Sequence, residues 1–229
     1  MTRDTARGPV RAVVFDFDGT LALLNVDFTE MRRRIRGCIA RYGVSSDGFE
    51  GLYVLEMVEK GASLIAEDDP GAREEFSRDA HGIIRELEID GASRGHIFPG
   101  VIDMIHTLKE QKIGVGIVTR NCEEAVSVLY PHIMTDCDAV ITREYTRRVK
   151  PDPDHLLTAL RRLDAAAHES VMVGDHPMDI STGKDVGTLT VGVLSGYADR
   201  EMMEKSAPDL IIDRAPDLIR EGHIVNINL

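Results

Sequence analysis

The sequence Val10-Arg11-Ala12-Val13-Val14-Phe15-Asp16-Phe17-Asp18-Gly19-Thr20 contains an apolar run that leads directly into two acidic residues and a glycine. A short, continuous run of this kind predicts a parallel β-strand that is buried on both faces. The acidic residues would then lie at the carboxyl end of the strand, which is the edge where open α/β sheets bind ligands. This one stretch therefore predicts both a fold class and the position of a site.

Five more apolar runs follow along the chain. They are residues 113–118, 139–141, 171–173, 189–193 and 210–212. Helical patterns separate the later runs, and in one of them Val101, Ile105 and Leu108 share a helix face. Alternation of strands and helices on this scale predicts an α/β fold with a doubly wound parallel sheet.

One interval, from Asn25 to about Arg94, contains no strand-like run. Apolar residues at helical spacing mark three helices in it, and the acidic segment 67–71, which contains Pro70 and Gly71, marks a turn. We therefore expect an all-helical domain at residues 25–95. It would be inserted into an α/β domain formed by residues 1–24 and 96–229.

The composition excludes several classes of protein. With 27 basic and 39 acidic residues among 229, the net charge of -12 disfavours non-specific binding to nucleic acid or to an anionic membrane. Three scattered cysteines are too few for a disulfide framework or a zinc cluster. The apolar run at 12–15 is too short for a signal peptide or a membrane span. We expect a cytoplasmic protein with reduced thiols that binds neither nucleic acid nor a membrane.

Asp16 and Asp18 are the first candidates for chemistry. Residues two apart on extended backbone point to the same side, so the two side chains would project together from the strand end. Two neighbouring carboxylates repel each other unless a cation or a shared proton joins them. The pair therefore indicates a metal or proton-transfer site, although a solvated turn would also contain Asp and Gly.

A second acidic pair follows the run at 171–173, in the segment Gly174-Asp175-His176-Pro177-Met178-Asp179. Gly174 permits close backbone approach, and Pro177 suits the first turn of a helix. Asp179 would lie near Asp175 at the start of that helix. Helix capping is the alternative role for Asp179, because acids stabilise helix N-termini.

One further strand end and one loop carry the next candidates. Thr119 follows the run at 113–118, and its hydroxyl and the next backbone N–H groups can hold phosphate oxygens. Arg120 is placed beside it to contact a substrate. Lys150 precedes Pro151 and a predicted helix start. The eight histidines include no pair four residues apart, and we assign none of them a role.

The order of these motifs resembles that of the haloacid dehalogenase superfamily, and in particular its phosphoglycolate-phosphatase-like branch with a helical cap of type C1. The resemblance implies that Asp16 is a nucleophile that forms an aspartyl-phosphate and that Asp18 is the general acid and base. It implies a Mg²⁺ ion held by the Asp16 side chain, the Asp18 backbone carbonyl and Asp175.

The resemblance also implies that Thr119 and Lys150 bind the transferring phosphoryl group and that Asp179 supports the metal waters or orients Lys150. An acid at position 18 argues against dehalogenases and phosphonatases. Two departures bear on the substrate: His176 replaces a small hydroxyl residue, and Ala22-Leu23-Leu24 replaces an acid-and-serine segment.

We therefore expect Mg²⁺-dependent hydrolysis of a small phosphorylated metabolite, with a phosphoglycolate-like ester as the leading candidate. A sugar phosphomutase of the same superfamily and a non-catalytic phosphometabolite-binding regulatory module are the alternatives. Monomer and homodimer both stay open.

Overall fold

The computed structural model describes residues 9–45 and 47–220. Its main sheet has six parallel strands in the order β5-β4-β1-β6-β7-β8. Their bounds are Ala12–Phe15 for β1, Gly114–Val118 for β4, Ala139–Ile141 for β5, Ser170–Gly174 for β6, Leu189–Val193 for β7 and Leu210–Ile212 for β8. All six predicted strands are present, and the predicted α/β fold class is confirmed.

Strand β1 lies at the centre of the sheet between β4 and β6. In this register Phe15 is level with Ile117 on one side and with Val173 on the other. All four residues of β1 are fully buried, as expected for a central parallel strand made of apolar and β-branched residues. The register places the residues that follow β1, β4 and β6 at one edge of the sheet.

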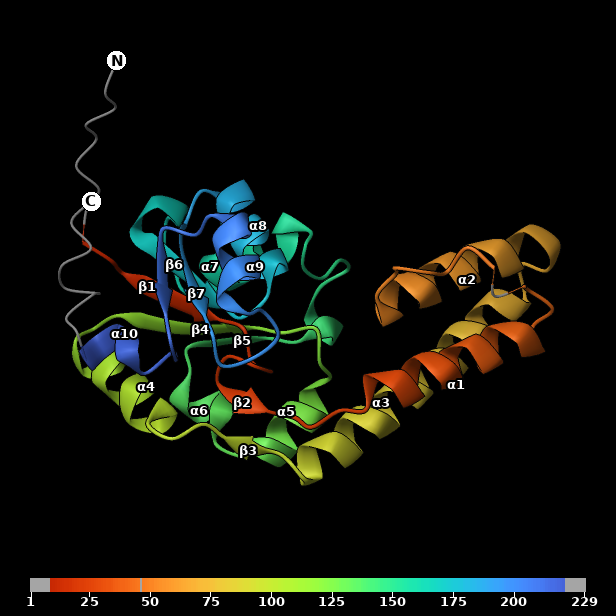
Figure 1. The fold of residues 1–229 in the computed structure, drawn as a ribbon, viewed down its shortest axis with the longest axis horizontal. Helices are drawn as coiled ribbons and strands as arrows, with labels where there is room; N and C mark the ends of the chain where they lie inside the picture. The colour runs from red at the N-terminus through yellow and green to blue at the C-terminus, as the bar shows by residue number, and fades with distance from the viewer. Residues whose placement is uncertain (1–8, 46, 221–229) are drawn as a thin grey trace, which may run out of the picture. The chain divides into compact units, whose positions relative to one another are not determined.

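Helices cover both faces of the sheet. They are α4 (Val101–Glu110), α5 (Glu123–Leu129), α6 (Ile133–Asp136), α7 (Pro153–Arg162), α8 (Pro177–Val186), α9 (Arg200–Ser206) and α10 (Asp217–Arg220), with short 3₁₀ turns at Arg143–Tyr145 and Ala167–Glu169. Helices α7, α8 and α9 lie on one side of the sheet, and α4 and α10 lie on the other (Figure 1). On α7, Leu156 and Leu160 pack against Val14 and Met172. The sheet is therefore doubly wound.

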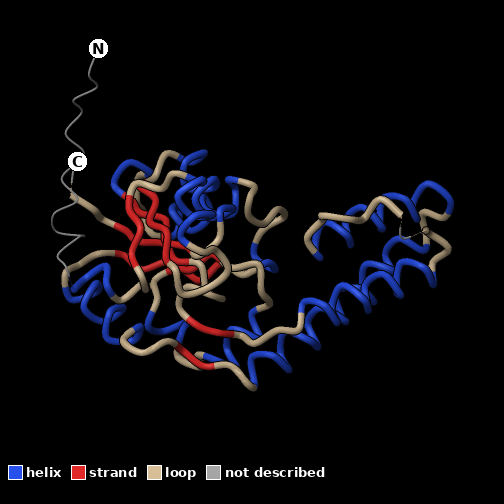
Figure 2. The backbone as a smooth tube through the Cα atoms, viewed as in Figure 1, coloured by secondary structure: helices blue, strands red, loops and turns tan. Residues whose placement is uncertain are grey.

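The chain divides into two compact units, Asn25–Arg94 and the remainder. The first unit consists of α1 (Phe28–Arg41), α2 (Val54–Asp68) and α3 (Ala72–Ser93). These helices enclose a core of their own, in which Ile39, Phe49 and Phe76 are fully buried. Among the described residues of this unit, the tube drawing in Figure 2 shows helices and loops and no strand.

A short antiparallel pair, β2 (Ala22–Leu23) with β3 (His96–Ile97), lies where the chain leaves and re-enters the α/β unit. A side chain at Gly95 would overlap the carbonyl of Leu23, so the two crossing segments require a glycine there. Two-residue strands carry no periodicity, and the sequence pattern did not predict them. Among the described residues, no helix is long and apolar enough to span a membrane.

Candidate active site

Asp16 is the first residue after β1, and its backbone N–H still donates to the carbonyl of Val173 on β6. Its side-chain Oδ1 accepts a hydrogen bond of 2.6 Å from the Phe17 backbone N–H. The same oxygen lies 2.9 Å from Nζ of Lys150. Both contacts fix one oxygen of the carboxylate and so orient the other.

Lys150 is a buried cation, with a side chain only 1% exposed. Its Nζ donates to Oδ1 of Asp179 at 2.7 Å and contacts Asp16. Burial alone would lower the pKa of Lys150, but the charges of Asp16 and Asp179 outweigh it and hold the pKa above its ordinary value. Lys150 therefore remains an ammonium ion, buried beside the carboxyl ends of the strands.

Asp175 follows β6 and is held on every side. Its Oδ1 accepts a hydrogen bond of 2.9 Å from the hydroxyl of Thr20, and its Oδ2 accepts one of 2.7 Å from the backbone N–H of Tyr197. An added Cβ at Gly19 or at Gly196 would overlap the Asp175 carboxylate. The two glycines let two loops close around one side chain, which fixes its position.

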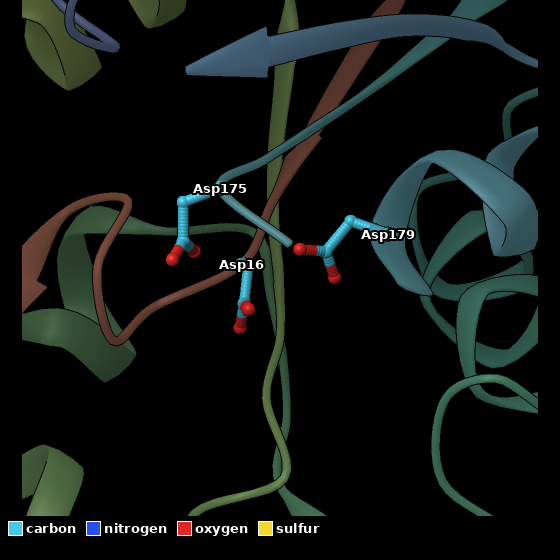
Figure 3. Close-up of side chains that lie close together, drawn as sticks. All are labelled: Asp16, Asp175 and Asp179. Carbon is cyan, nitrogen blue, oxygen red and sulfur yellow. The ribbon is translucent and has the colours of Figure 1, made fainter. Parts of the chain in front are cut away.

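Asp16, Asp175 and Asp179 converge at this edge, as Figure 3 shows, with carboxylate oxygens within 4.8 Å of one another. Burial, opposed by the charge of Lys150 and reinforced by that of Asp179, raises the pKa of Asp16 to about 6. Burial and the charge of Asp16 raise the pKa of Asp175 to about 6. The cluster thus carries more negative charge than Lys150 neutralises, and its donors are all oxygens. A Mg²⁺ ion fits such a donor set.

Asp18 is not part of this group of three acids. Its Oδ1 accepts a hydrogen bond of 2.8 Å from the Leu24 backbone N–H, six residues later in the chain. Between them Gly19 has a φ of +81°, a conformation that favours glycine, and its N–H donates to the Ala22 carbonyl. The acids that the structure groups are therefore Asp16, Asp175 and Asp179. The role of Asp18 as acid and base, and of its carbonyl as a ligand, stays a prediction.

Asp179 is both a helix residue and a partner of Lys150. Its Oδ2 accepts from the backbone N–H of His176, and the ring of His176 accepts from the N–H of Met178, which together form a capping box at the start of α8. The two roles weighed for this acid, capping and orientation of Lys150, are thus combined in one side chain. Burial and the charge of Lys150 lower the pKa of His176 to about 4, so its ring is neutral.

Thr119 follows β4 and is fully buried. Its hydroxyl donates to Oδ1 of Asn121 at 2.8 Å and accepts from the Asn121 N–H. Its backbone N–H donates to the carbonyl of Ile141 on β5. Arg120 is half-buried, and its Nη1 lies 3.2 Å from Sδ of Met178.

Several residues around the site had no signal strong enough for prediction. Asn121 and the loop at Tyr197 act through hydrogen bonds to Thr119 and to Asp175, which no spacing rule reveals. His155 accepts a hydrogen bond from the backbone N–H of Lys150 at 3.0 Å. The sequence signal for His155 was a histidine next to Leu156, on the apolar face of a helix that starts just after Lys150.

Carboxylates with raised pKa values, beside a buried ammonium at the ligand-binding edge of a parallel sheet, are features of an α/β enzyme. The family model of the haloacid dehalogenase-like hydrolases matches residues 13–193. The chain therefore belongs to the haloacid dehalogenase-like hydrolase family, and the resemblance seen in its motifs is confirmed.

Two relatives illustrate the range of the family. A haloacid dehalogenase-like hydrolase domain-containing protein of Arabidopsis thaliana is 31% identical over 186 residues, which cover 81% of this chain and 71% of that protein. The pyrophosphatase PpaX of Bacillus mycoides is 36% identical over 121 residues, which cover 52% of this chain and 56% of that protein. The alignment thus spans little more than half the length of PpaX.

Solved structures share the fold over nearly the whole chain. A hydrolase from Pseudomonas syringae superposes with a TM-score of 0.69 at 18% identity and covers 95% of this chain and 99% of its own. The β-phosphoglucomutase of Clostridium difficile gives a TM-score of 0.65 at 19% identity, with 93% and 94% covered. A predicted phosphoglycolate phosphatase from Haemophilus somnus gives 0.63 at 16%, with 93% and 97% covered.

Proposed function

We propose that this protein is a Mg²⁺-dependent phosphatase that hydrolyses a small phosphomonoester through an aspartyl-phosphate on Asp16. One observation carries the proposal: a carboxylate at the central strand end has Oδ1 fixed by Phe17 and by the buried ammonium of Lys150. Family membership supports the same reading. A carboxylate held in this way is suited to nucleophilic catalysis.

The attacking atom is Oδ2 of Asp16. Phe17 and Lys150 both contact Oδ1, so in the proposed reaction Oδ2 is the oxygen that faces the substrate phosphorus. With a pKa of about 6, the carboxylate is mostly ionised at neutral pH. Attack forms the Oδ2–P bond and breaks the bond between phosphorus and the ester oxygen.

Lys150 and Thr119 bind the transferring phosphoryl group. The ammonium of Lys150 offsets negative charge on the phosphoryl oxygens, an electrostatic contribution that usually dominates this chemistry. The hydroxyl of Thr119 now donates to Asn121, and on substrate binding it turns to donate to a phosphoryl oxygen. Asn121 then keeps the threonine oriented through its own N–H.

Asp18 acts as the general acid and then as the general base. In its protonated form it donates to the departing ester oxygen, so that an alcohol leaves. As a carboxylate it then takes a proton from the water that attacks the aspartyl-phosphate, which releases phosphate and restores Asp16. The hydrogen bond from Leu24 anchors Asp18 on the segment that leads towards the helical unit.

Asp16, Asp175 and the carbonyl of Asp18 would hold the Mg²⁺ ion, with Asp179 supporting its water ligands. The ion, when bound, offsets the charge of the cluster and of the phosphate, so that an anionic nucleophile and an anionic substrate can meet. The residues themselves orient the substrate and move its protons.

The substrate we propose is a small phosphorylated metabolite with a phosphoglycolate-like ester as the first candidate. Arg120, the neighbour of Thr119 in the chain, is our candidate for contact with a second anionic group of such a substrate. PpaX, a relative, is a pyrophosphatase, which makes pyrophosphate a second compound to test. By resemblance to the family, the helical unit Asn25–Arg94 would act as a cap that sets substrate specificity.

The test is phosphate release from a panel of phosphomonoesters and pyrophosphate, with and without Mg²⁺, for the wild type and for Asp16→Asn. We expect Mg²⁺-dependent turnover that the variant lacks. Isomerised sugar phosphate without phosphate release would instead indicate a mutase. Folded, Mg²⁺-loaded protein that turns over no compound would overturn the proposal in favour of a binding module.

A further inference from the structure

His155 is a buried histidine, and each of its two ring nitrogens hydrogen-bonds to a backbone group. Its Nδ1 accepts from the N–H of Lys150 at 3.0 Å, and its Nε2 lies 3.1 Å from the carbonyl of Ile141. A backbone N–H can only donate and a carbonyl can only accept, so the proton must sit on Nε2. The ring is fully buried, and its tautomer is fixed by its neighbours.

The Ile141 carbonyl has a second donor. The backbone N–H of Thr119 also donates to it, at 3.0 Å. One carbonyl at the end of β5 therefore joins Thr119 on one side to the ring of His155 on the other, and the ring continues to Lys150. The two residues proposed to bind the phosphoryl group are linked through a single imidazole.

We propose that His155 is a positioning residue of the phosphoryl-binding site, which fixes the backbone of Lys150 relative to that of Thr119. This inference rests on the proposed function. The geometry needs a neutral ring, because a protonated Nδ1 would repel the N–H of Lys150. Burial and the charge of Lys150 lower the pKa of His155 to about 3, which keeps the ring neutral at working pH. His155 acts through hydrogen bonds and transfers no proton.

The competing explanation is that His155 only fills space on the apolar face of α7, where Leu156 and Leu160 are buried beside it. The two explanations rank substitutions in opposite order. A space-filling role is best preserved by leucine, which is apolar. A bridging role is best preserved by glutamine, whose amide offers one acceptor and one donor at a separation close to that of the two ring nitrogens.

The experiment compares His155→Leu and His155→Gln with the wild type on its best substrate. We expect kcat/KM to fall roughly 100-fold in His155→Leu, since small misplacements of binding groups have effects of this size, and to recover most of the loss in His155→Gln. A fully active leucine variant with a weaker glutamine variant would overturn the proposal. If the leucine variant does not fold, His155→Asn replaces it, because its side chain is one methylene shorter and its amide cannot reach both partners.

Leu156→Ala is the matched control, because it removes buried packing from the same helix but neither of the two hydrogen bonds of His155. Its melting temperature should fall while kcat/KM of the folded enzyme stays near the wild-type value. A readout independent of turnover is hydrogen exchange at the Lys150 amide. It should be slow in the wild type and in His155→Gln and fast in His155→Leu, and equal rates in all three would contradict the inference.

The two proposals fail separately. If the wild type hydrolyses no compound, the proposed function falls and the positioning role falls with it. If the wild type is active and His155→Leu is equally active, the positioning role alone is lost.

Discussion

Lys150 and Asp179 form an ion pair that is almost sealed from solvent, with Nζ and Oδ1 2.7 Å apart and each side chain 1% exposed. The same ammonium lies 2.9 Å from Asp16. Burial of charges is costly and rarely the best way to stabilise a fold. The pair is therefore better explained by what it does for Asp16 and for a bound phosphate than by stability.

Removal of Asp179 from this ion pair should lower both stability and activity. In Asp179→Leu the ammonium of Lys150 loses its shortest contact, and we expect a loss of about 3–5 kcal/mol in the free energy of unfolding, as for other broken buried pairs. Activity should fall as well, because Asp179 no longer fixes the position of Lys150 beside Asp16. Denaturant unfolding and kcat/KM measure the two effects.

The control for this variant is an exposed ion pair of the same kind. Lys205 and Glu201 are 73% and 79% exposed, so Glu201→Gln should change the free energy of unfolding by less than about 1 kcal/mol. If Asp179→Leu proved as mild as Glu201→Gln, the pair would not hold the site together.

A second prediction concerns the glycine at position 196. A Cβ added there would overlap the Asp175 carboxylate, so Gly196→Ala must displace either that acid or its loop. We expect roughly a 100-fold loss of kcat/KM, because the proposed metal ligand is misplaced. The apparent affinity for Mg²⁺ should weaken in parallel, and isothermal titration measures it.

Gly37 provides the contrasting substitution. It lies inside α1, and an added Cβ would meet no atom within 4 Å. Gly37→Ala should therefore stabilise the protein by about 0.5–1 kcal/mol without change in activity. Equal losses in both alanine variants would contradict the reading of Gly196.

The pH dependence of metal binding is a third prediction. Asp16 and Asp175 have pKa values raised from 3.8 to about 6 in the folded, metal-free protein. The folded state holds these protons more tightly than the unfolded chain does. Their contribution to stability is therefore complete below the unfolded pKa and is lost as the pH rises through about 6.

Because Mg²⁺ needs the carboxylates without protons, it should raise the melting temperature more at about pH 8 than at about pH 5. Thermal unfolding with and without Mg²⁺ at both pH values measures this, with Asp175→Asn as the control that should lose the difference. A Mg²⁺ effect that is equal or larger at the lower pH would argue against metal binding by these acids.

The sequence predicted those parts of the fold that depend on repeated patterns. Apolar runs located each strand because a strand buried on both faces excludes polar residues, and helical spacing located α1, α2 and α3. Lys150 was found from its place in the order of the motifs, and Asp16 and Asp175 because the carboxyl ends of parallel strands share one edge. Their convergence follows from topology alone.

Other features depend on contacts that produce no periodic pattern in the sequence. The Asp18 side chain accepts a hydrogen bond from the Leu24 N–H across a turn that Gly19 permits. The bridge from His155 to Lys150 and Ile141 spans segments that are distant in sequence, and His155 shows only as a polar residue beside Leu156. Such details require the folded backbone.

The central claim, that Asp16 carries the phosphoryl group, is tested most directly by trapping the intermediate. Asp18→Asn should slow hydrolysis of the aspartyl-phosphate more than its formation, so that the intermediate accumulates with the substrate found in the panel. Rapid quenching with borohydride reduces an acyl-phosphate to the alcohol, and mass spectrometry locates the changed residue. We predict reduction at Asp16 only, dependent on both Mg²⁺ and substrate. Reduction at another residue, or at none while the wild type releases phosphate, would contradict the account.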